Sequence, residues 1–396
     1  MNIRIIILIL LALSTDHGIV RAQWISEKCP TTNDLNAICF SDSNSAWIVG
    51  NKGTILRRSG NYWIELKKTT QKDLHSVFMI DKNNGWAVGE KGTILYYNGF
   101  DWKVSESPTD KDLYSVTFNE LQSGIAVGEN GTIIIYEDGK WNLVEKDTHA
   151  NLRTAAIVND EILIGGGLEY AGVPIMQMHN NESALKSLFD PNAEISSMVF
   201  TNGDYGWAVG SAGAIVHFDG MNWYKPENKF NIPTLRSVFF SDTFNGICAG
   251  LNGTILTFSD NIWIKENTSL TTDLNGCSIF GNTYYAIGDS GTILTKKLQK
   301  DINALPLLVK NFDGVELYPN PCHDVLNINI KMPFDCHSVI ISITSEDGQT
   351  LFHKPFNPEK GNLSCSINTS SFKSGFYLLN VGGTSYSNTK KFLVFK

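Results

Sequence analysis

The chain repeats one sequence unit seven times at a nearly constant period. Each unit opens on an apolar residue, and these seven residues are Leu35, Leu74, Leu113, Leu152, Ile195, Leu235 and Leu274. They are separated by 39, 39, 39, 43, 40 and 39 positions. Self-similarity at a period of about 40 residues is typical of architectures in which each repeat packs only on its neighbours, such as propellers and solenoids.

Each unit carries the pattern W-x-x-G-x-x-G-T-I or a degraded copy of it, as in Trp47–Ile55. A second tryptophan follows at Trp63, Trp102, Trp141, Trp223 and Trp263. Short β-rich runs separated by Gly, Asn and Asp turns indicate four strands per unit. For the second unit the predicted strands are Leu74–Ile80, Trp86–Gly89, Thr93–Tyr97 and Trp102–Ser105. Seven such units predict an all-β fold, a seven-bladed β-propeller over residues 23–298.

The last unit is incomplete, because its second tryptophan is missing and the chain runs into Lys296 and Lys297. Trp24 stands 11 residues before Leu35, as Trp63 stands 11 residues before Leu74. We therefore expect the segment that begins at Gln23 to supply the missing strand of the seventh blade. Such closure removes an exposed sheet edge.

The first 22 residues have the features of a secretory signal peptide. Ile5–Leu13 is an unbroken apolar run after Arg4, and small side chains occur at Val20 and Ala22. The run is too short for a membrane span, which needs about 20 apolar residues in a helix. We expect cleavage after Ala22 and no transmembrane segment. The mature chain is then exported, with a net charge of about -9 (-8 minus +1).

The repeat ends near Leu298, and residues 299–313 are predicted to be a linker. Alternating runs in residues 314–396 predict a small Ig-like β-sandwich. This module contains Y-P-N-P, D-G-Q and S-G-F-Y segments and a closing basic-aromatic tail. Its motif residues are Tyr318, Pro319, Asn320, Pro321, Gly348, Gly375, Lys391 and Lys396.

Two family resemblances rest on these motifs. The L-x-S-V, W-A-V-G and G-T-I-L segments of residues 23–298 resemble the photosystem II stability/assembly-factor propellers and their BNR-like relatives. Residues 314–396 resemble the type IX secretion sorting domain of Bacteroidota. The second resemblance implies export through the outer membrane by the type IX machinery, to the exterior or to the cell surface. A spacer or sugar-binding sandwich remains the alternative for this module.

In the assembly-factor family, arginines gather on one face and meet the client protein. The matching positions here directly follow each opening residue, and they are Asn36, His75, Tyr114, Arg153, Ser196, Arg236 and Asn275. Because only two of these are arginine, the photosynthetic client is not carried over. We predict a non-enzymatic propeller that binds an unidentified protein or glycan. The predicted contacts are Arg153, Arg236, His75 and Tyr114, together with Glu169 and Tyr170 on a protruding loop of the divergent fourth unit.

The alternative is a sialidase-like glycoside hydrolase of the cell surface, because such enzymes are also BNR-containing propellers. They need several arginines around a carboxylate, with a tyrosine nucleophile and an acid. The mature chain offers only Arg57, Arg58, Arg153 and Arg236. Glu169 and Tyr170 would form the acid–tyrosine pair, but the BNR box survives only as a degraded copy at 217–223.

Other classes of site find little support in the sequence. A net charge of -8 disfavours a nucleic-acid partner. The seven cysteines have no C-x-x-C spacing and the eight histidines are scattered, so no metal site and no cofactor are predicted. We interpret Asp81-x-Asn83 as an Asx turn and not a calcium loop. Aspartates that precede the opening leucines, at 34, 73, 112 and 273, are interpreted as connector turns, and the tryptophans as wedges between blades.

Overall fold

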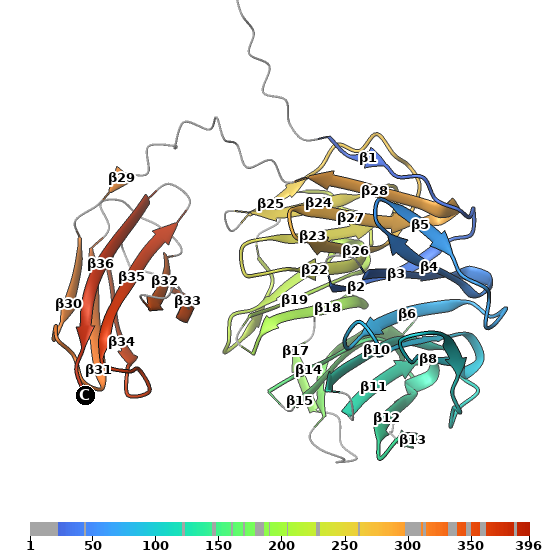
Figure 1. Cartoon of the computed structure of the whole chain (residues 1–396), viewed down its shortest axis with the longest axis horizontal. Coiled ribbons are helices and arrows are strands. Elements are labelled where there is room, and N and C mark those ends of the chain that lie inside the picture. Colours follow the sequence, from blue (N-terminus) through green and yellow to red (C-terminus); the bar gives the residue numbers. More distant parts are fainter. Residues whose placement is uncertain are drawn as a thin grey trace, which may run out of the picture. The chain divides into compact units, whose positions relative to one another are not determined.

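The computed structural model describes residues 23–297, 310–311 and 314–396, except for short internal gaps. These gaps are 43–44, 121–122, 145–147, 160, 169–170, 179–185, 190, 204, 227–229, 260–261, 332–338, 346–349, 357–361 and 384–385. The predicted signal peptide thus lies outside the described residues, and so does the predicted linker except for Lys310 and Asn311, which pair with β36 (Tyr386–Val394) as a short strand. The chain forms two compact units, a ring of sheets and a C-terminal sandwich (Figure 1).

The first unit contains seven four-stranded antiparallel sheets, which we call blades one to seven. Blade one is β2 (Leu35–Asp42), β3 (Ser45–Gly50), β4 (Thr54–Ser59) and β5 (Tyr62–Glu65). Blade two is β6 (Leu74–Met79), β7 (Gly85–Gly89), β8 (Ile94–Tyr97) and β9 (Trp102–Val104). Blade three is β10 (Leu113–Glu120), β11 (Ser123–Gly128), β12 (Ile133–Glu137) and β13 (Lys140–Val144). Blade four is β14 (Asn151–Val158), β15 (Glu161–Leu168), β16 (Ala171–Met178) and β17 (Lys186–Phe189).

The remaining blades follow the same order. Blade five is β18 (Ile195–Asn202), β19 (Tyr205–Gly210), β20 (Ile215–Phe218) and β21 (Trp223–Tyr224). Blade six is β22 (Leu235–Phe240), β23 (Gly246–Gly250), β24 (Ile255–Ser259) and β25 (Ile262–Lys265). Blade seven is β26 (Leu274–Phe280), β27 (Thr283–Gly288), β28 (Thr292–Lys297) and β1 (Ile25–Ser26). The strands predicted for the second unit agree with blade two within one residue at each end.

The first strands of successive blades contact one another around the ring, and β26 contacts β2 to complete it. The predicted closure is confirmed, since Ile25 pairs with Thr295 and Ser26 with Leu294 across β1 and β28. Next to this short strand, Glu27 accepts a hydrogen bond from Trp63 Nε1 at 2.8 Å, and its carboxylate lies 3.3 Å from Arg58. The N-terminal strand is thus fixed to blade one as well as to blade seven.

Tight turns join the second and third strands of most blades. These are 3-10 turns at η1 (Asn51–Gly53), η2 (Glu90–Gly92), η3 (Glu129–Gly131), η4 (Ser211–Gly213) and η5 (Asp289–Gly291). The second residue of each is left-handed, as in Lys52 with φ 53°, and the glycine that follows is left-handed too. A Cβ on Gly53 would collide with the Thr70 carbonyl. The glycine of the G-T-I segment is therefore required by both backbone conformation and space.

Tryptophans fill the spaces between neighbouring blades, as predicted. Trp47 of blade one is fully buried and meets Tyr97 and Trp102 of blade two, with ring centroids 4.7 and 5.5 Å apart. Trp86 of blade two meets Trp141 of blade three in the same edge-on manner, at 5.4 Å. Aromatic pairs of this geometry stabilise a packed interface beyond the area that they bury.

We expect Trp47→Ala to lower the free energy of unfolding of the propeller by about 3–5 kcal/mol, because it empties a closed interface between two blades. Tyr62→Ala is the matched control, since Tyr62 is 66% exposed on the outermost strand of the same blade. Urea unfolding of the full chain measures both. Equal losses in the two variants would contradict the role assigned to Trp47.

Blade five holds a buried histidine against the neighbouring blade. His217 is 5% exposed, and its Nδ1 lies 3.0 Å from the Tyr224 hydroxyl. Its ring lies 4.2 Å from that of Trp207, which stacks on Phe240 of blade six. Burial lowers the pKa of His217 to about 4, against the attraction of Asp219.

Stability should therefore fall as pH drops through the interval between the unfolded pKa of about 6.5 and the folded value. The native state holds the neutral ring and the unfolded chain takes up the proton first, so the loss is complete only below pH 4. The full pKa shift of His217 corresponds to a loss of about 3 kcal/mol in the free energy of unfolding. We expect this part of the acid destabilisation to disappear in His217→Phe. The free energy of unfolding of both chains is measured at pH 7.5 and at pH 4.5. An equal loss between these two pH values in the variant and in the native chain would contradict the role assigned to His217.

The C-terminal unit is a sandwich of two sheets around one core, as predicted. The larger sheet has the order β29 (Lys310–Asn311), β36 (Tyr386–Val394), β35 (Gly375–Gly383), β32 (Val339–Ser345) and β33 (Thr350–Phe356). The smaller sheet has the order β30 (Val315–Tyr318), β31 (Val325–Lys331) and β34 (Asn362–Asn368). Both contribute alternate apolar side chains to the core, including Ile328, Ile341 and Leu379, which are fully buried.

Candidate functional site

The seven predicted slot positions lie at the same point of equivalent strands. Each slot residue directly follows the opening residue of its unit, from Asn36 on β2 to Asn275 on β26, and is the second residue of its strand except for Arg153, the third residue of β14. Because these strands are equivalent members of one ring, the slots fall at one end of it, and all seven side chains are half-buried. We call this set the slot ring. It is the surface on which four of the predicted contacts were placed.

Three of those contacts form a continuous row across blades two, three and four. The rings of His75 and Tyr114 lie 5.7 Å apart, and the Arg153 guanidinium lies 4.4 Å from the centre of the Tyr114 ring. Arg153 Nε then donates a hydrogen bond of 2.8 Å to Glu194, directly before blade five. We call these four side chains the stacked strip. About one third of the side-chain surface of Arg153 and of Glu194 is exposed, at 36% and 32%.

The stacked strip carries no net charge near neutral pH. Burial lowers the pKa of His75, although Asp112 and Asp73 oppose this, so the imidazole is neutral at pH 7. Burial raises the pKa of Tyr114, so its hydroxyl keeps the proton. The positive charge of Arg153 is balanced by Glu194 at salt-bridge distance. The strip thus offers aromatic faces and hydrogen-bonding groups, in place of the excess positive charge of an arginine cluster.

The fourth predicted contact belongs to a separate polar network. Arg236 donates to the Asn275 side-chain oxygen and lies 3.3 Å from Asp273. Asn275 Nδ2 in turn donates to the Leu35 carbonyl at 3.0 Å, across the point where the ring closes. Asn36 bonds to the Leu74 carbonyl of the next blade in the same way, at 2.8 Å. Slots of blades six, seven and one therefore hold neighbouring blades together.

Glu194 was missed by the sequence analysis. It occupies the position directly before Ile195, where other units carry Asp34, Asp73, Asp112 and Asp273. Those aspartates accept backbone N–H bonds from the turn of the preceding blade, as Asp73 does from Lys52 at 2.7 Å. Glu194 has the longer side chain and accepts from Arg153 of the preceding blade. The sequence did contain a signal for this pair. The slot of unit four is an arginine, and the next unit carries Glu where most other units carry Asp.

Blade four has a long hairpin at the place where the sequence predicts a protruding loop. β15 and β16 are paired strands of eight residues each, and their register runs out to Leu168 and Ala171. The extra residues of this unit therefore extend a hairpin that replaces the 3-10 turn of other blades. The predicted contacts Glu169 and Tyr170 lie outside the described residues. A Cβ on Gly167 would touch the Glu194 side chain, which places this end of the hairpin at the stacked strip.

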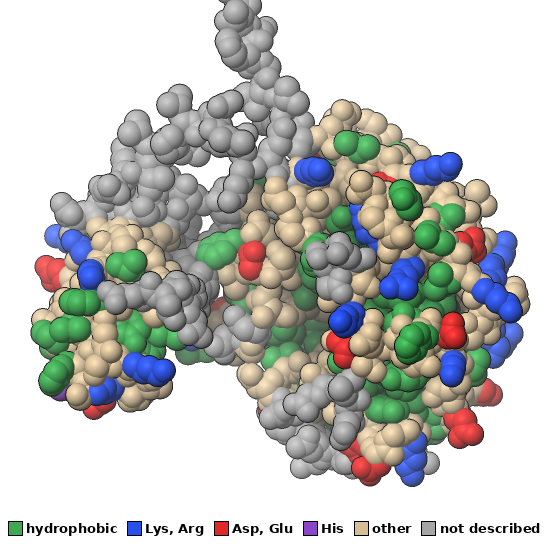
Figure 2. Space-filling view, in the orientation of Figure 1, with side chains coloured by type: hydrophobic (Ala, Val, Ile, Leu, Met, Phe, Trp, Pro, Cys, Tyr) green, Lys and Arg blue, Asp and Glu red, His purple; other side chains and the backbone are tan. Residues whose placement is uncertain are grey.

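The arginines needed for a sialidase-like centre are dispersed. Arg57 and Arg58 are on β4, the third strand of blade one, where Arg57 lies over Trp47 and Arg58 over Trp63 and Tyr285. They point to opposite sides of the sheet, as alternation along a strand predicts. The degraded BNR box is a hairpin turn, in which Asp219 Oδ1 accepts the N–H of Met221 and Asn222. On the face of the propeller seen in Figure 2, acidic and basic side chains are interspersed.

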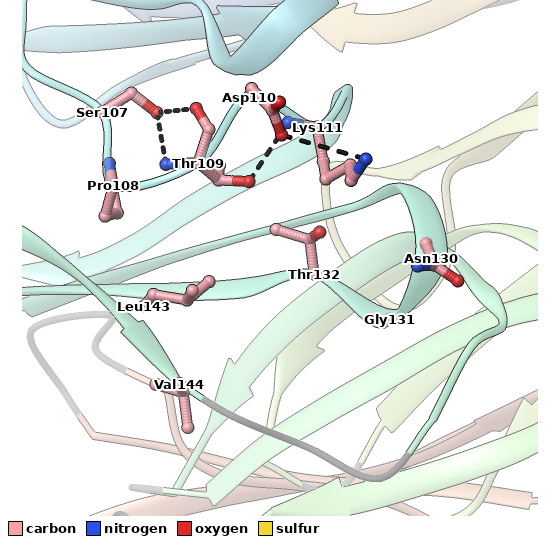
Figure 3. Close-up of a pocket in the computed structure, with 10 residues that line it drawn as sticks. All are labelled: Ser107, Pro108, Thr109, Asp110, Lys111, Asn130, Gly131, Thr132, Leu143 and Val144. Carbon is pink, nitrogen blue, oxygen red and sulfur yellow. Dashed lines mark hydrogen bonds and ion pairs between the residues drawn. The ribbon is translucent and has the colours of Figure 1, made fainter.

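Described residues of the propeller line a cavity and a groove. One is a cavity of about 360 Å³ lined by the first strands of blades one to six, including Cys39, Phe78 and Thr117. The other is an open groove of about 690 Å³ on blade three, between the 107–111 connection and β13 (Figure 3). Ser107, Thr109 and Lys111 in its wall bond to one another. Neither hollow contains a predicted site residue.

Among the described residues no group of three or more His, Cys, Asp or Glu side chains could hold a metal ion. Asp81 accepts the N–H of Asn83 and Asn84, so it forms the Asx turn that we predicted. Six of the seven cysteines are described and are free thiols, and Cys336 lies outside the described residues. No helix long and apolar enough to span a membrane occurs in the described part.

Two of the predicted sorting-motif residues, Asn320 and Lys396, connect the two sheets of the sandwich. Tyr318 ends β30, and Asn320 Oδ1 accepts the N–H of Leu393 on β36 at 3.0 Å. The Lys396 ammonium reaches Asp324 at 2.8 Å and holds the pKa of that carboxyl below its usual value. Gly375 begins β35, and Lys391 lies over the Phe376 ring. Pro319 and Pro321 follow cis peptide bonds, whereas Gly348 lies outside the described residues.

Both units of the chain are similar to known proteins. Residues 316–395 match the family model of the secretion system C-terminal sorting domain, which confirms the resemblance of this module. No curated protein sequence matches the chain. A propeller followed by this sorting domain is the organisation of a secreted propeller protein.

Solved structures share the fold of the first unit. A structure titled "YCF48 bound to D1 peptide" aligns with a TM-score of 0.57 and 18% identity, over 70% of this chain and 95% of that one. YCF48 from Cyanidioschyzon merolae gives 0.57 and 16%, over 70% and 99%. The WD40 propeller of Doa1 gives 0.57 and 14%, over 70% and 98%. These likenesses establish a propeller of the kind seen in assembly factors and WD40 proteins.

Proposed function

We propose that this protein is a secreted, non-enzymatic binding module whose stacked strip contacts an extended polypeptide segment of its partner. The observation that carries the proposal is the continuous contact of His75, Tyr114, Arg153 and Glu194 across four blades. Residues 1–22 act in this proposal as the signal peptide, and residues 314–396 direct export by the type IX machinery to the exterior or the cell surface.

The chemistry of the strip favours a polypeptide partner. A neutral surface of aromatic rings with a guanidinium whose side chain is about one third exposed can stack on side chains and donate to backbone carbonyls. An anionic sugar would need positive charge in excess, but Glu194 and Asp273 balance both slot arginines. One of the propellers of similar fold was solved with a bound peptide, as its title states. In this proposal the hairpin of blade four extends the surface beyond the strip, since its residue Gly167 lies against Glu194, and Glu169 and Tyr170 remain proposed contacts.

We expect Tyr114→Ala and Arg153→Ala each to weaken binding at least tenfold, because each removes a partly buried stacking element near the centre of the strip. Arg153→Lys should also bind poorly, since a lysine ammonium has no planar group to stack on the tyrosine ring. Partners are first captured from a surface extract of the producing cell with the full chain, and affinities are then measured by calorimetry. Arg57→Ala is the matched control, because Arg57 is exposed on β4 away from the slot ring.

The double variant Arg153→Ala/Arg236→Ala, if it folds and binds its partner unchanged, would rule out the slot ring as the binding surface. A glycan panel and fluorogenic sialosides provide the second arm. Turnover of a glycoside by the native chain that is lost in Arg236→Ala would replace the binding proposal with the hydrolase alternative.

A further inference from the structure

The two outer faces of the sorting module differ in chemistry. The outward side chains of the smaller sheet are mostly Asn and Ser, and several bond to one another. Ser366 donates to Asn327 at 2.7 Å, and Asn329 donates to the Tyr318 hydroxyl at 3.2 Å. Hydrogen bonds within the face leave fewer groups to recognise another surface.

The larger sheet exposes a compact apolar patch. Phe376 and Leu378 are two residues apart on β35, so they share one face, and they are 44% and 41% exposed. Their cross-strand partners on β36 are Leu393 and Lys391. The Lys391 ammonium lies 3.8 Å from the centre of the Phe376 ring. We call these four side chains the β35–β36 patch, and Figure 2 shows hydrophobic and basic side chains next to one another on this module.

The segment that contains β35 and β36 is also positively charged. Residues 373–396 contain four lysines and neither Asp nor Glu, in a chain whose net charge is -8. Lys396 contacts Asp324 of the loop before β31, and the Lys391 ammonium lies over Phe376 within the patch. An apolar centre with a cation at its edge fits an apolar hollow rimmed by carboxylates on a partner.

We propose that the β35–β36 patch is the surface through which the secretion machinery reads this sorting module, by means of a protein component with an acidic rim. The inference rests on the proposed role of residues 314–396 as the export signal. It assigns that role to one face of the sandwich, whereas the Y-P-N-P segment and Lys396 hold the two sheets and the chain end together.

The test is an export assay of the full chain in the producing cell, with the protein measured in the medium, at the cell surface and in the periplasm. We expect Phe376→Ser/Leu378→Ser and Lys391→Glu each to lower the exported fraction at least tenfold, with accumulation in the periplasm. Lys391→Arg should export normally, because a guanidinium keeps the charge over the ring. Val325→Ser is the matched control, since Val325 is 45% exposed on the outer face of the smaller sheet.

Thermal unfolding of each purified variant shows whether the sandwich still folds. Normal export of the double variant would overturn the proposal, and so would equal loss of export with Val325→Ser. Deletion of residues 314–396 separates this inference from the proposal beneath it. If export survives the deletion, the module is not the signal, whereas loss on deletion with normal export of the patch variants removes only the assigned face.

Discussion

Closure of the ring by two paired residues is the constraint on which the rest of the propeller depends. Ile25 and Ser26 complete blade seven, and Asn275 and Ser290 of that blade bond to Leu35 and Asp34 of blade one. Without this junction blades seven and one would each present an open side, and the tryptophan interfaces would lack a partner at the seam. The seven slots occupy equivalent places only because the ring is closed.

The same repeated positions serve two purposes in different blades. Where the slot is Asn, its amide reaches a backbone carbonyl of the next blade and joins the two sheets. Where the slot is His, Tyr or Arg, the side chain instead meets the neighbouring slot and leaves a surface exposed. Other contacts between blades, including the bonds from aspartates to the preceding turn, also hold the ring together. Some slot side chains are therefore not needed for this purpose and are available to bind a partner.

The fold followed almost wholly from the sequence because period, turn glycines and paired tryptophans are local signals. The site followed only in part. His75, Tyr114 and Arg153 were identified as equivalent positions, and the structure brings them together. Arg236 was placed with them, but it belongs to the network of Asn275 and Asp273. Glu194 escaped notice because its partner is 41 residues away, and no local pattern specifies which side chains meet across a blade interface.

The sequence alone determined the number of blades, the closure by the N-terminal strand, and the sandwich that follows, since each depends on spacing along the chain. Tertiary structure alone decided the character of the candidate surfaces. The sequence suggested that Arg153 and Arg236 are what remains of a basic face. In the structure each is paired with a carboxylate that directly precedes the following unit. The extra residues of blade four belong to a long hairpin, in which β15 and β16 stay paired as far as Leu168 and Ala171. Charge balance and strand register depend on residues that are neighbours in space but distant along the chain. A single sequence does not show which residues these are.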